Sequence, residues 1–203
     1  MHDIDGKPVY SNVQEIVDPV HTALVVWDVQ NLLVNSIFNK EEFMKNISLV
    51  IESARSTAKI PIFYTAIEML PIRFESSSRL YTYNKLYASM KRSMPEKRDL
   101  SLAIKTTGDE MIIPKHTASI FIGTDFERMI RNAGITTIIF TGIATELGVE
   151  SSARDALNRD FYPVIVSDAV SSLDKDAHMR SLQNMERFLT VISTKEITSI
   201  WSR

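Results

Sequence analysis

Residues 23–27 form the apolar run Ala23-Leu24-Val25-Val26-Trp27, which is continuous rather than alternating. Four further runs share this character, at residues 61–64, 137–140, 162–166 and 190–192. Continuous apolar runs are typical of strands that are covered on both faces, as in the parallel sheets of α/β proteins. These runs therefore predict a parallel sheet.

Amphipathic helical patterns lie between the runs, at about residues 40–58, 124–133, 146–158 and 176–188. Thr124, with Glu127 three residues later, predicts a capping box at the start of the second helix, and Gly134 predicts its end. Because strands and helices alternate, we predict an α/β fold. Its core would be a three-layer, doubly wound (Rossmann-like), mostly parallel sheet with helices on both faces.

The length of 203 residues favours a single domain over residues 1–203, with residues 1–20 as an N-terminal extension. Residues 66–110 interrupt the regular pattern and hold a basic cluster, made up of Lys91, Arg92, Lys97 and Arg98. Loops at the carboxyl ends of parallel strands often carry ligand-binding groups, so we expect this variable insertion to shape the site or cover it as a lid. A solvated surface excursion is the alternative.

The composition excludes several classes of function. A net charge of −2, with Lys and Arg dispersed, provides no basic stripe for nucleic acid. No apolar run approaches the ~20 residues that span a bilayer, and residues 1–20 do not resemble a signal peptide, so we expect no membrane partner and a cytoplasmic location. The chain has no cysteine, which excludes disulfides, thiolate metal sites and thiol nucleophiles.

Two charged residues follow apolar runs and are candidates for chemistry. Asp28 directly follows the first run, so its carboxylate would emerge at the carboxyl edge of the sheet, where active sites of α/β proteins lie. An aspartate there also caps helices, and position alone does not separate the two readings. Lys115 follows the short apolar stretch 111–114; a lone lysine is more often a solvated surface residue.

The segment from Thr141 to Ala156 joins the run at 137–140 to a helix, which predicts a strand–turn–helix elbow. Backbone N–H groups at the start of such a helix lack intrahelical partners and suit an oxyanion or a carboxylate. Simple capping of the helix by Thr145 is the alternative.

Three of these segments together resemble the isochorismatase-like family, also called cysteine hydrolases. They are residues 26–30 (Val-Trp-Asp-Val-Gln), residues 114–125 with Gly123-Thr124, and the elbow at 141–156 with Ala153-Arg154-Asp155-Ala156. Their order and spacing match across most of residues 20–195. The resemblance implies a doubly wound sheet and a catalytic triad of Asp, Lys and Cys, which falls on Asp28, Lys115 and Gly148. Thiol attack on a carbonyl or nitrile carbon is therefore closed to this chain.

Isochorismatases similarly carry Gly at the position of Gly148, and they cleave a vinyl ether by acid catalysis instead of covalent attack. The resemblance implies that Asp28 donates the proton and that Lys115 orients both Asp28 and the substrate. This chain departs from isochorismatases at Ala66-Ile67-Glu68, where they have Ala-Gln-Pro, and at Thr145-Glu146, where they have Ala-His. Isochorismate is therefore one possible substrate among others. Glu146 is a second candidate carboxylate for activating water, or a helix-start glutamate favoured by the dipole.

Our leading hypothesis is a cofactor-independent hydrolase of a small metabolite, with Asp28 and Lys115 as acid–base pair. The assigned anion- or substrate-binding residues are Ala144, Thr145, Glu146 and Gln30, with the N–H groups of Ala144 and Gly148 as an anion hole. We expect no metal, because none of the four His lies in the loop after the second run, and His116 is more typical of a surface or packing residue than of a ligand. The rival hypothesis is a catalytically silent member that binds a metabolite or protein. The resemblance also implies a homodimer or higher oligomer.

Overall fold

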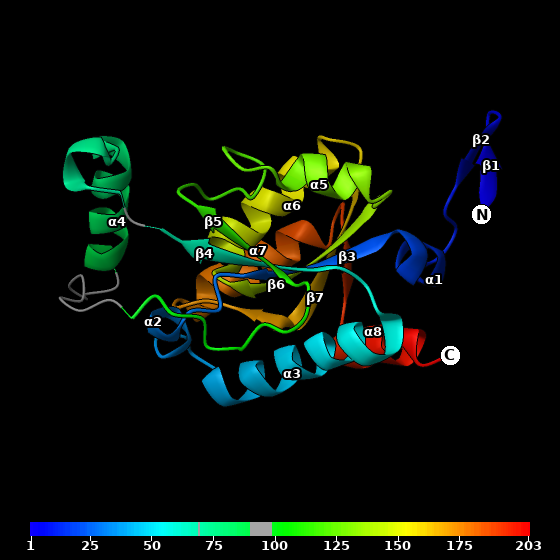
Figure 1. Cartoon of the computed structure of the whole chain (residues 1–203), viewed down its shortest axis with the longest axis horizontal. Helices are drawn as coiled ribbons and strands as arrows, with labels where there is room; N and C mark the ends of the chain where they lie inside the picture. Colours follow the sequence, from blue (N-terminus) through cyan, green and yellow to red (C-terminus); the bar gives the residue numbers. More distant parts are fainter. Residues whose placement is uncertain (69, 90–98) are drawn as a thin grey trace.

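The structure, a computed structural model, describes residues 1–68, 70–89 and 99–203. In this part of the chain a parallel sheet of six strands has the order β5-β4-β3-β6-β7-β8 (Figure 1). The strands are β3 (Thr22–Trp27), β4 (Ile62–Ile67), β5 (Met111–Lys115), β6 (Thr137–Ile143), β7 (Tyr162–Ser171) and β8 (Thr190–Ile192). The chain builds one half of the sheet outward from β3 and the other half outward from β6. Its switch point, where such folds bind ligands, therefore lies between β3 and β6.

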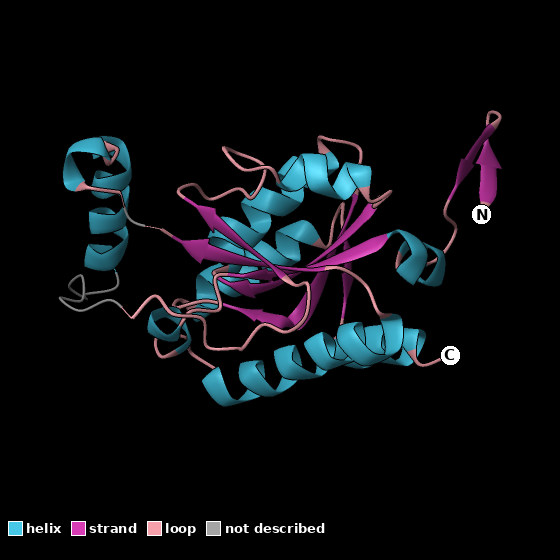
Figure 2. Cartoon of the chain, in the orientation of Figure 1, coloured by secondary structure: helices cyan, strands magenta, loops and turns pink. Residues whose placement is uncertain are grey.

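Helices cover both faces of this sheet (Figure 2). One face packs against α3 (Lys40–Ser53) and α8 (Thr194–Trp201), and the other against α5 (Phe126–Asn132), α6 (Glu150–Leu157) and α7 (Lys175–Met185). Alternate residues of β3 point to opposite faces: Leu24 and Val26 belong to the first core cluster, and Val25 and Trp27 to the second. The predicted three-layer, doubly wound α/β fold is confirmed.

The predicted helices at 40–58 and 176–188 correspond to α3 with a following π-helical turn, η2 (Ala54–Ala58), and to α7, which Asp174 caps. The predicted capping box was wrong. Helix α5 begins at Phe126 after Asp125, Thr124 accepts from the Phe126 N–H in a local turn, and Glu127 pairs with Arg131. Because Thr124 also donates to the carbonyl of Ile120, its hydroxyl is fixed outside the helix.

Several short elements were not predicted from the sequence. They are the hairpin β1 (His2–Ile4) and β2 (Lys7–Val9), helices α1 (Val13–Ile16), α2 (Asn31–Val34) and α4 (Ser77–Ser89), and the 3₁₀ turns η1 (Pro19–His21) and η3 (Ile72–Phe74). These elements are too short or too weakly amphipathic to show a clear hydrophobic period, so the sequence pattern does not reveal them. The hairpin and α4 stand at opposite ends of the molecule (Figure 1). No helix in the described ranges is long and apolar enough to cross a membrane.

The described residues of the insertion at 66–110 contact the carboxyl edge of the sheet. Arg79 of α4 donates to the carbonyl of His116, which directly follows Lys115. Ser101 and Ala103 hydrogen-bond to the backbone just after β3, where the Ala103 N–H donates to the carbonyl of Val29 at 2.9 Å. The predicted basic cluster at 91–98 lies outside the described residues.

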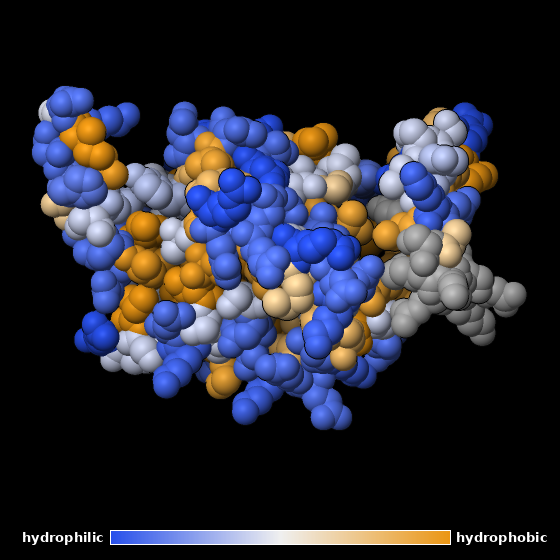
Figure 3. Space-filling model, turned by 180° about the vertical axis from the view of Figure 1, so that it is seen from behind, coloured by the Kyte–Doolittle hydropathy of each residue, from blue (hydrophilic) through white to orange (hydrophobic). Residues whose placement is uncertain are grey.

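Seen from behind, the surface of the molecule is largely hydrophilic, with hydrophobic residues interspersed, as is ordinary for a globular protein (Figure 3).

Candidate active site

The candidate site starts at Asp28, the first residue after β3. The backbone of Asp28 has a left-handed conformation, with φ of 47°. Strict alternation would place the side chains of Trp27 and Asp28 on opposite faces of the sheet. The positive φ, which aspartate tolerates better than most residues, breaks that alternation. The Asp28 N–H donates to the hydroxyl of Thr65 on β4 at 2.9 Å, which holds this turn in place.

The Asp28 carboxylate binds one side chain from each of the next two strands. The Thr65 hydroxyl donates to Oδ1 at 2.5 Å, and Lys115 Nζ, at the end of β5, donates to Oδ2 at 2.8 Å. Asp28 and Lys115 are each only 4% exposed. A buried lysine needs an acidic partner, and this one has it. The surface reading of Lys115 and the helix-capping reading of Asp28 are therefore excluded by the geometry.

Burial shifts both members of this pair toward their neutral forms. Desolvation raises the pKa of Asp28 above its usual range and outweighs the opposing effects of Lys115 and Thr65. Desolvation likewise lowers the pKa of Lys115, against the attraction of Asp28. A carboxyl group with a raised pKa remains a proton donor closer to neutral pH, which is what a general acid requires.

Trp27 is the second neighbour of Lys115. Lys115 Nζ lies 4.2 Å from the centre of the Trp27 ring, within cation–π range, and Trp27 is 1% exposed. The indole also lies against Gly148: a Cβ added to Gly148 would meet Trp27 Nε1 at 1.9 Å, far inside contact distance. The structure thus brings Gly148, Trp27, Lys115 and Asp28 together.

The elbow after β6 runs through the π-helical turn η4 (Thr145–Val149) into α6. Gly142 has φ of 111°, and a Cβ there would lie 2.0 Å from the backbone oxygen of Trp27, so only glycine fits this close approach. Ala144 follows a cis peptide bond and is half-buried. Its carbonyl accepts from the N–H groups of Leu147 and Val149.

Thr145 does not cap the helix, so that alternative was wrong. Its hydroxyl is within hydrogen-bond distance of the Ser171 carbonyl, at 3.1 Å, and of His178 Nδ1, at 2.8 Å. Thr145 and His178 are both buried, and burial lowers the pKa of His178. The hydroxyl of Thr145 therefore joins the elbow to β7 and α7, and is already engaged within the protein.

Glu146 lies on the β7 side of the elbow. Its Oε1 accepts from the Ser172 hydroxyl at 2.7 Å, whereas Oε2 is buried without a partner among the described residues. Partial burial raises the pKa of Glu146. A carboxylate with a raised pKa and one buried oxygen that has no partner among the described residues is suited to accept a proton.

Gln30 was assigned to ligand binding, and the structure shows both ends of its amide in use. Its Oε1 accepts from the N–H of Ile67 at the end of β4 at 3.1 Å, and its Nε2 donates to the carbonyl of Leu100. Gln30 is fully buried. Its side chain therefore fastens the insertion and β4 to the loop that carries Asp28.

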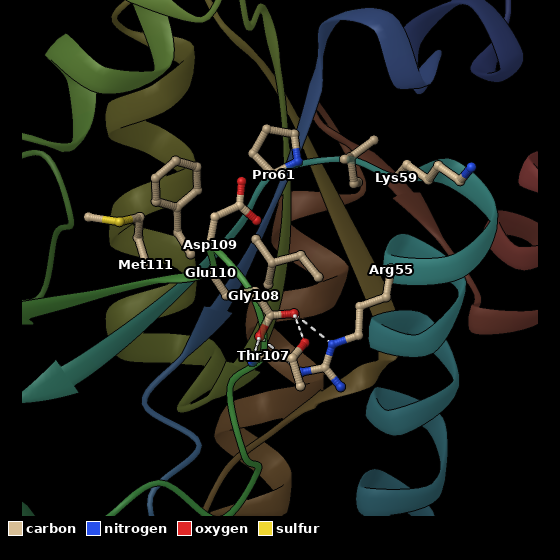
Figure 4. A pocket seen from close by; sticks show the side chains of 11 residues that line it. Arg55, Lys59, Pro61, Thr107, Gly108, Asp109, Glu110 and Met111 are labelled. Carbon is tan, nitrogen blue, oxygen red and sulfur yellow. Dashed lines mark hydrogen bonds and ion pairs between the residues drawn. The ribbon is translucent and has the colours of Figure 1, made fainter.

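His116 directly follows Lys115 in the sequence, and its side chain lies at the rim of the site. His116 Nδ1 is 2.9 Å from the Glu68 carbonyl at the rim, as expected for a packing residue. Within the described ranges no group of three or more His, Cys, Asp or Glu side chains is placed to hold a metal ion. A cleft of about 380 Å³ lies at the amino ends of β4 and β5, where Arg55 pairs with Glu110 (Figure 4). It is thus at the opposite edge of the sheet from Asp28.

Two members of the site were not recognised from the sequence. Thr65 is a polar residue inside an apolar strand, and Trp27 is a large aromatic residue directly before the candidate acid. The polar interruption at Thr65 was a usable signal, because a buried hydroxyl needs a partner. No feature of the sequence around Trp27 indicated that its ring would lie against Gly148 of the elbow.

Fold and site together define the class: a doubly wound α/β protein with a buried carboxylate–ammonium pair beside the switch point of its sheet. Residues 22–196 match the model of the isochorismatase domain. The chain therefore belongs to the isochorismatase family, as predicted.

Individual relatives agree with this assignment. Enterobactin synthase component B of Escherichia coli is 26% identical over 184 residues, which are 89% of this chain and 63% of that protein. This chain thus spans less than two thirds of that relative. The ureidoacrylate amidohydrolase of Pseudomonas savastanoi pv. phaseolicola is 29% identical over 202 residues, covering 87% of this chain and 81% of that protein. A cysteine hydrolase from Pseudomonas syringae shares the fold, with a TM-score of 0.78, 20% identity, and coverage of 96% of this chain and 97% of that chain.

Proposed function

We propose that this protein is a hydrolase of a small metabolite that works by acid–base catalysis through Asp28 and Lys115, without a cysteine nucleophile. The observation that carries the proposal is the buried pair of Asp28 and Lys115, joined at 2.8 Å at the carboxyl edge of the sheet. The names of two relatives, an amidohydrolase and a cysteine hydrolase, support hydrolysis as the reaction class.

Vinyl-ether hydrolysis, as of isochorismate, is the reaction that best fits a site with Gly148 in place of a thiol. Asp28 transfers its proton to the terminal vinyl carbon, and the neighbouring carbon becomes an oxocarbenium centre. Water adds to that centre and loses a proton, and the resulting hemiketal separates into a ketone and an alcohol. Lys115 stabilises the carboxylate that Asp28 becomes, since the two groups are already in contact.

The elbow supplies the remaining proposed contacts. Its N–H groups at Ala144 and Gly148 are assigned to an anionic part of the substrate. Glu146, with its free buried oxygen and raised pKa, is assigned to accept the proton from the attacking water. Thr145 and Gln30 support the site from within the protein, through the bonds that they make to β7 and β4.

The test is a hydrolysis screen of wild type, Asp28→Asn and Lys115→Met on isochorismate, nicotinamide and a panel of small amides and esters. Both changes preserve size while removing a charge, and we expect at least ~100-fold loss of kcat, within the range of lost acid–base catalysis. The matched control is Asp109→Asn, an exposed aspartate at the opposite edge of the sheet. If no substrate is turned over faster by wild type than by Asp28→Asn, the silent binding protein becomes the better description.

Further properties expected from the sequence stay predictions. They are a single domain with an N-terminal extension and a variable insertion that shapes the site, operation without a cofactor or metal, a cytoplasmic location, and self-association. Sedimentation of the purified chain measures the last of these. A homodimer or larger assembly is the expected result.

A further inference from the structure

We propose that Trp27 is a positioning residue that occupies the place of a side chain at position 148 and holds Lys115 against Asp28. The part concerning Lys115 rests on the proposed function, whereas the part concerning position 148 rests on packing alone. Trp27 and Gly148 are then a matched pair, and the glycine is not an isolated loss of a nucleophile.

The first observation is that the Trp27 ring occupies the space that a side chain at position 148 would need. Three atoms of the indole, Nε1, Cε2 and Cζ2, would lie 1.9, 2.1 and 2.4 Å from a Cβ at this position. Such distances require Trp27 to move, because real Cβ atoms do not approach other atoms so closely. Trp27 is enclosed by its core cluster, which includes Phe140 and Val149, so it has little room to yield.

The second step is the environment of Lys115. Its ammonium group lies 2.8 Å from the Asp28 carboxylate and over the Trp27 ring, 4.2 Å from the ring centre. An aromatic face favours the charged form of an amine and restricts its position. Trp27 is thus a second contact, besides Asp28, that restricts the position of the Lys115 ammonium group.

The consequence is that a thiol at position 148 and an indole at position 27 exclude each other. A chain with Trp27 cannot regain a thiol mechanism through Gly148→Cys alone. The reaction in this site is therefore one that proceeds without covalent attack from position 148.

The test begins with thermal unfolding of wild type, Gly148→Ala, Trp27→Leu and the double variant. We expect Gly148→Ala to lower Tm by about 5 °C or more, as overpacking of a core does in a chain of this size. In the Trp27→Leu background the same change should cost less than half as much. If Trp27→Leu alone prevents folding, Trp27→Val provides the background.

Gly142→Ala is the matched control for this cycle. Its added Cβ would meet backbone atoms of Trp27, which Trp27→Leu leaves in place. Gly142→Ala should therefore cost the same in both backgrounds. Equal costs of Gly148→Ala in the two backgrounds would overturn the pairing.

The role toward Lys115 is measured without any substrate, by NMR titration of protein carrying ¹³C-labelled lysine, in which the Lys115 Cε signal is followed over a series of pH values. In Trp27→Leu the loss of the aromatic face should move the midpoint to lower pH. Trp27→Phe, which keeps an aromatic face, should retain the midpoint of wild type. An unchanged or raised midpoint in Trp27→Leu would refute the positioning role, whatever the hydrolysis screen shows.

Discussion

At the scale of single residues, the site depends on one left-handed aspartate. Asp28 leaves its strand with φ of 47°, and the turn lets its carboxylate reach Lys115 while its N–H reaches Thr65. Both contacts cross from β3 to neighbouring strands. The backbone torsion of Asp28 thus determines which groups its carboxylate contacts, and with them the chemistry of the site.

The raised pKa of Asp28 predicts the pH dependence of the reaction. If Asp28 is the proton donor, the active form is the protonated one, and its fraction falls as pH rises through that pKa. We therefore expect kcat to decrease on the alkaline side. The measurement is kcat against pH for the substrate found in the screen; a rate that instead rises with pH through this range would contradict the role of acid.

Thr65→Val should change both this profile and the stability. The hydrogen bond from Thr65 favours the charged carboxylate, so its loss raises the pKa of Asp28 further and moves the alkaline limb to higher pH. The change also leaves the Asp28 N–H without its acceptor, at a cost of about 1–3 kcal/mol. Urea unfolding measures that cost. Thr65→Ser, which keeps the hydroxyl, should behave like wild type in both measurements.

At the scale of elements, the elbow is held by contacts to β7 and α7 and not by a cap of its own. The Thr145 hydroxyl lies between the Ser171 carbonyl and His178, and Glu146 binds Ser172. Phe38 lies edge-on to His178, with ring centres 5.2 Å apart. These contacts fix the turn that presents Gly148 to Trp27.

His178 should make the elbow sensitive to acid. Burial lowers its pKa below the unfolded value of 6.5, so the folded chain favours neutral imidazole. The contribution of neutral His178 to the free energy of unfolding is fully present above pH 6.5. It is lost as pH falls through that value toward the lower pKa of the folded state. The free energy of unfolding should therefore decline between pH 7.5 and 5.5. His178→Gln, which does not titrate, should lose less over the same interval; an identical decline would exclude His178 as the cause.

At the scale of the whole molecule, the order of the sheet brings distant segments to one edge. Lys115 is 87 positions and Thr65 is 37 positions from Asp28, yet both strands end beside it. On another side, α8 is joined to the segment that precedes β3, where Trp201 Nε1 donates to the carbonyl of Val17 at 3.0 Å. Stability and activity thus depend in part on different contacts.

Trp201→Phe should separate these two properties. The change removes the bond to Val17 and part of a buried side chain, which costs about 1–3 kcal/mol, while Asp28 and Lys115 are untouched. We expect a lower Tm together with unchanged kcat. It also leaves Trp27 as the only tryptophan, so ligand binding at the site should alter the remaining fluorescence. Loss of activity in proportion to stability would contradict the separation.

The sequence by itself determined the class of fold and the two ends of the ion pair. Continuous apolar runs require cover on both faces, which predicted the doubly wound parallel sheet. The resemblance to the isochorismatase-like family put Asp28 and Lys115 in one site, whereas its own neighbours in the sequence made Lys115 more typical of a surface residue. Only the tertiary structure decided which partners meet there. Thr65, Trp27 and Gln30 make contacts that depend on register between strands and on the torsion at Asp28. The periodicity of a segment shows which of its faces is buried. It does not show which side chain of a neighbouring strand lies opposite, or which torsion a residue adopts, so these contacts could not be predicted.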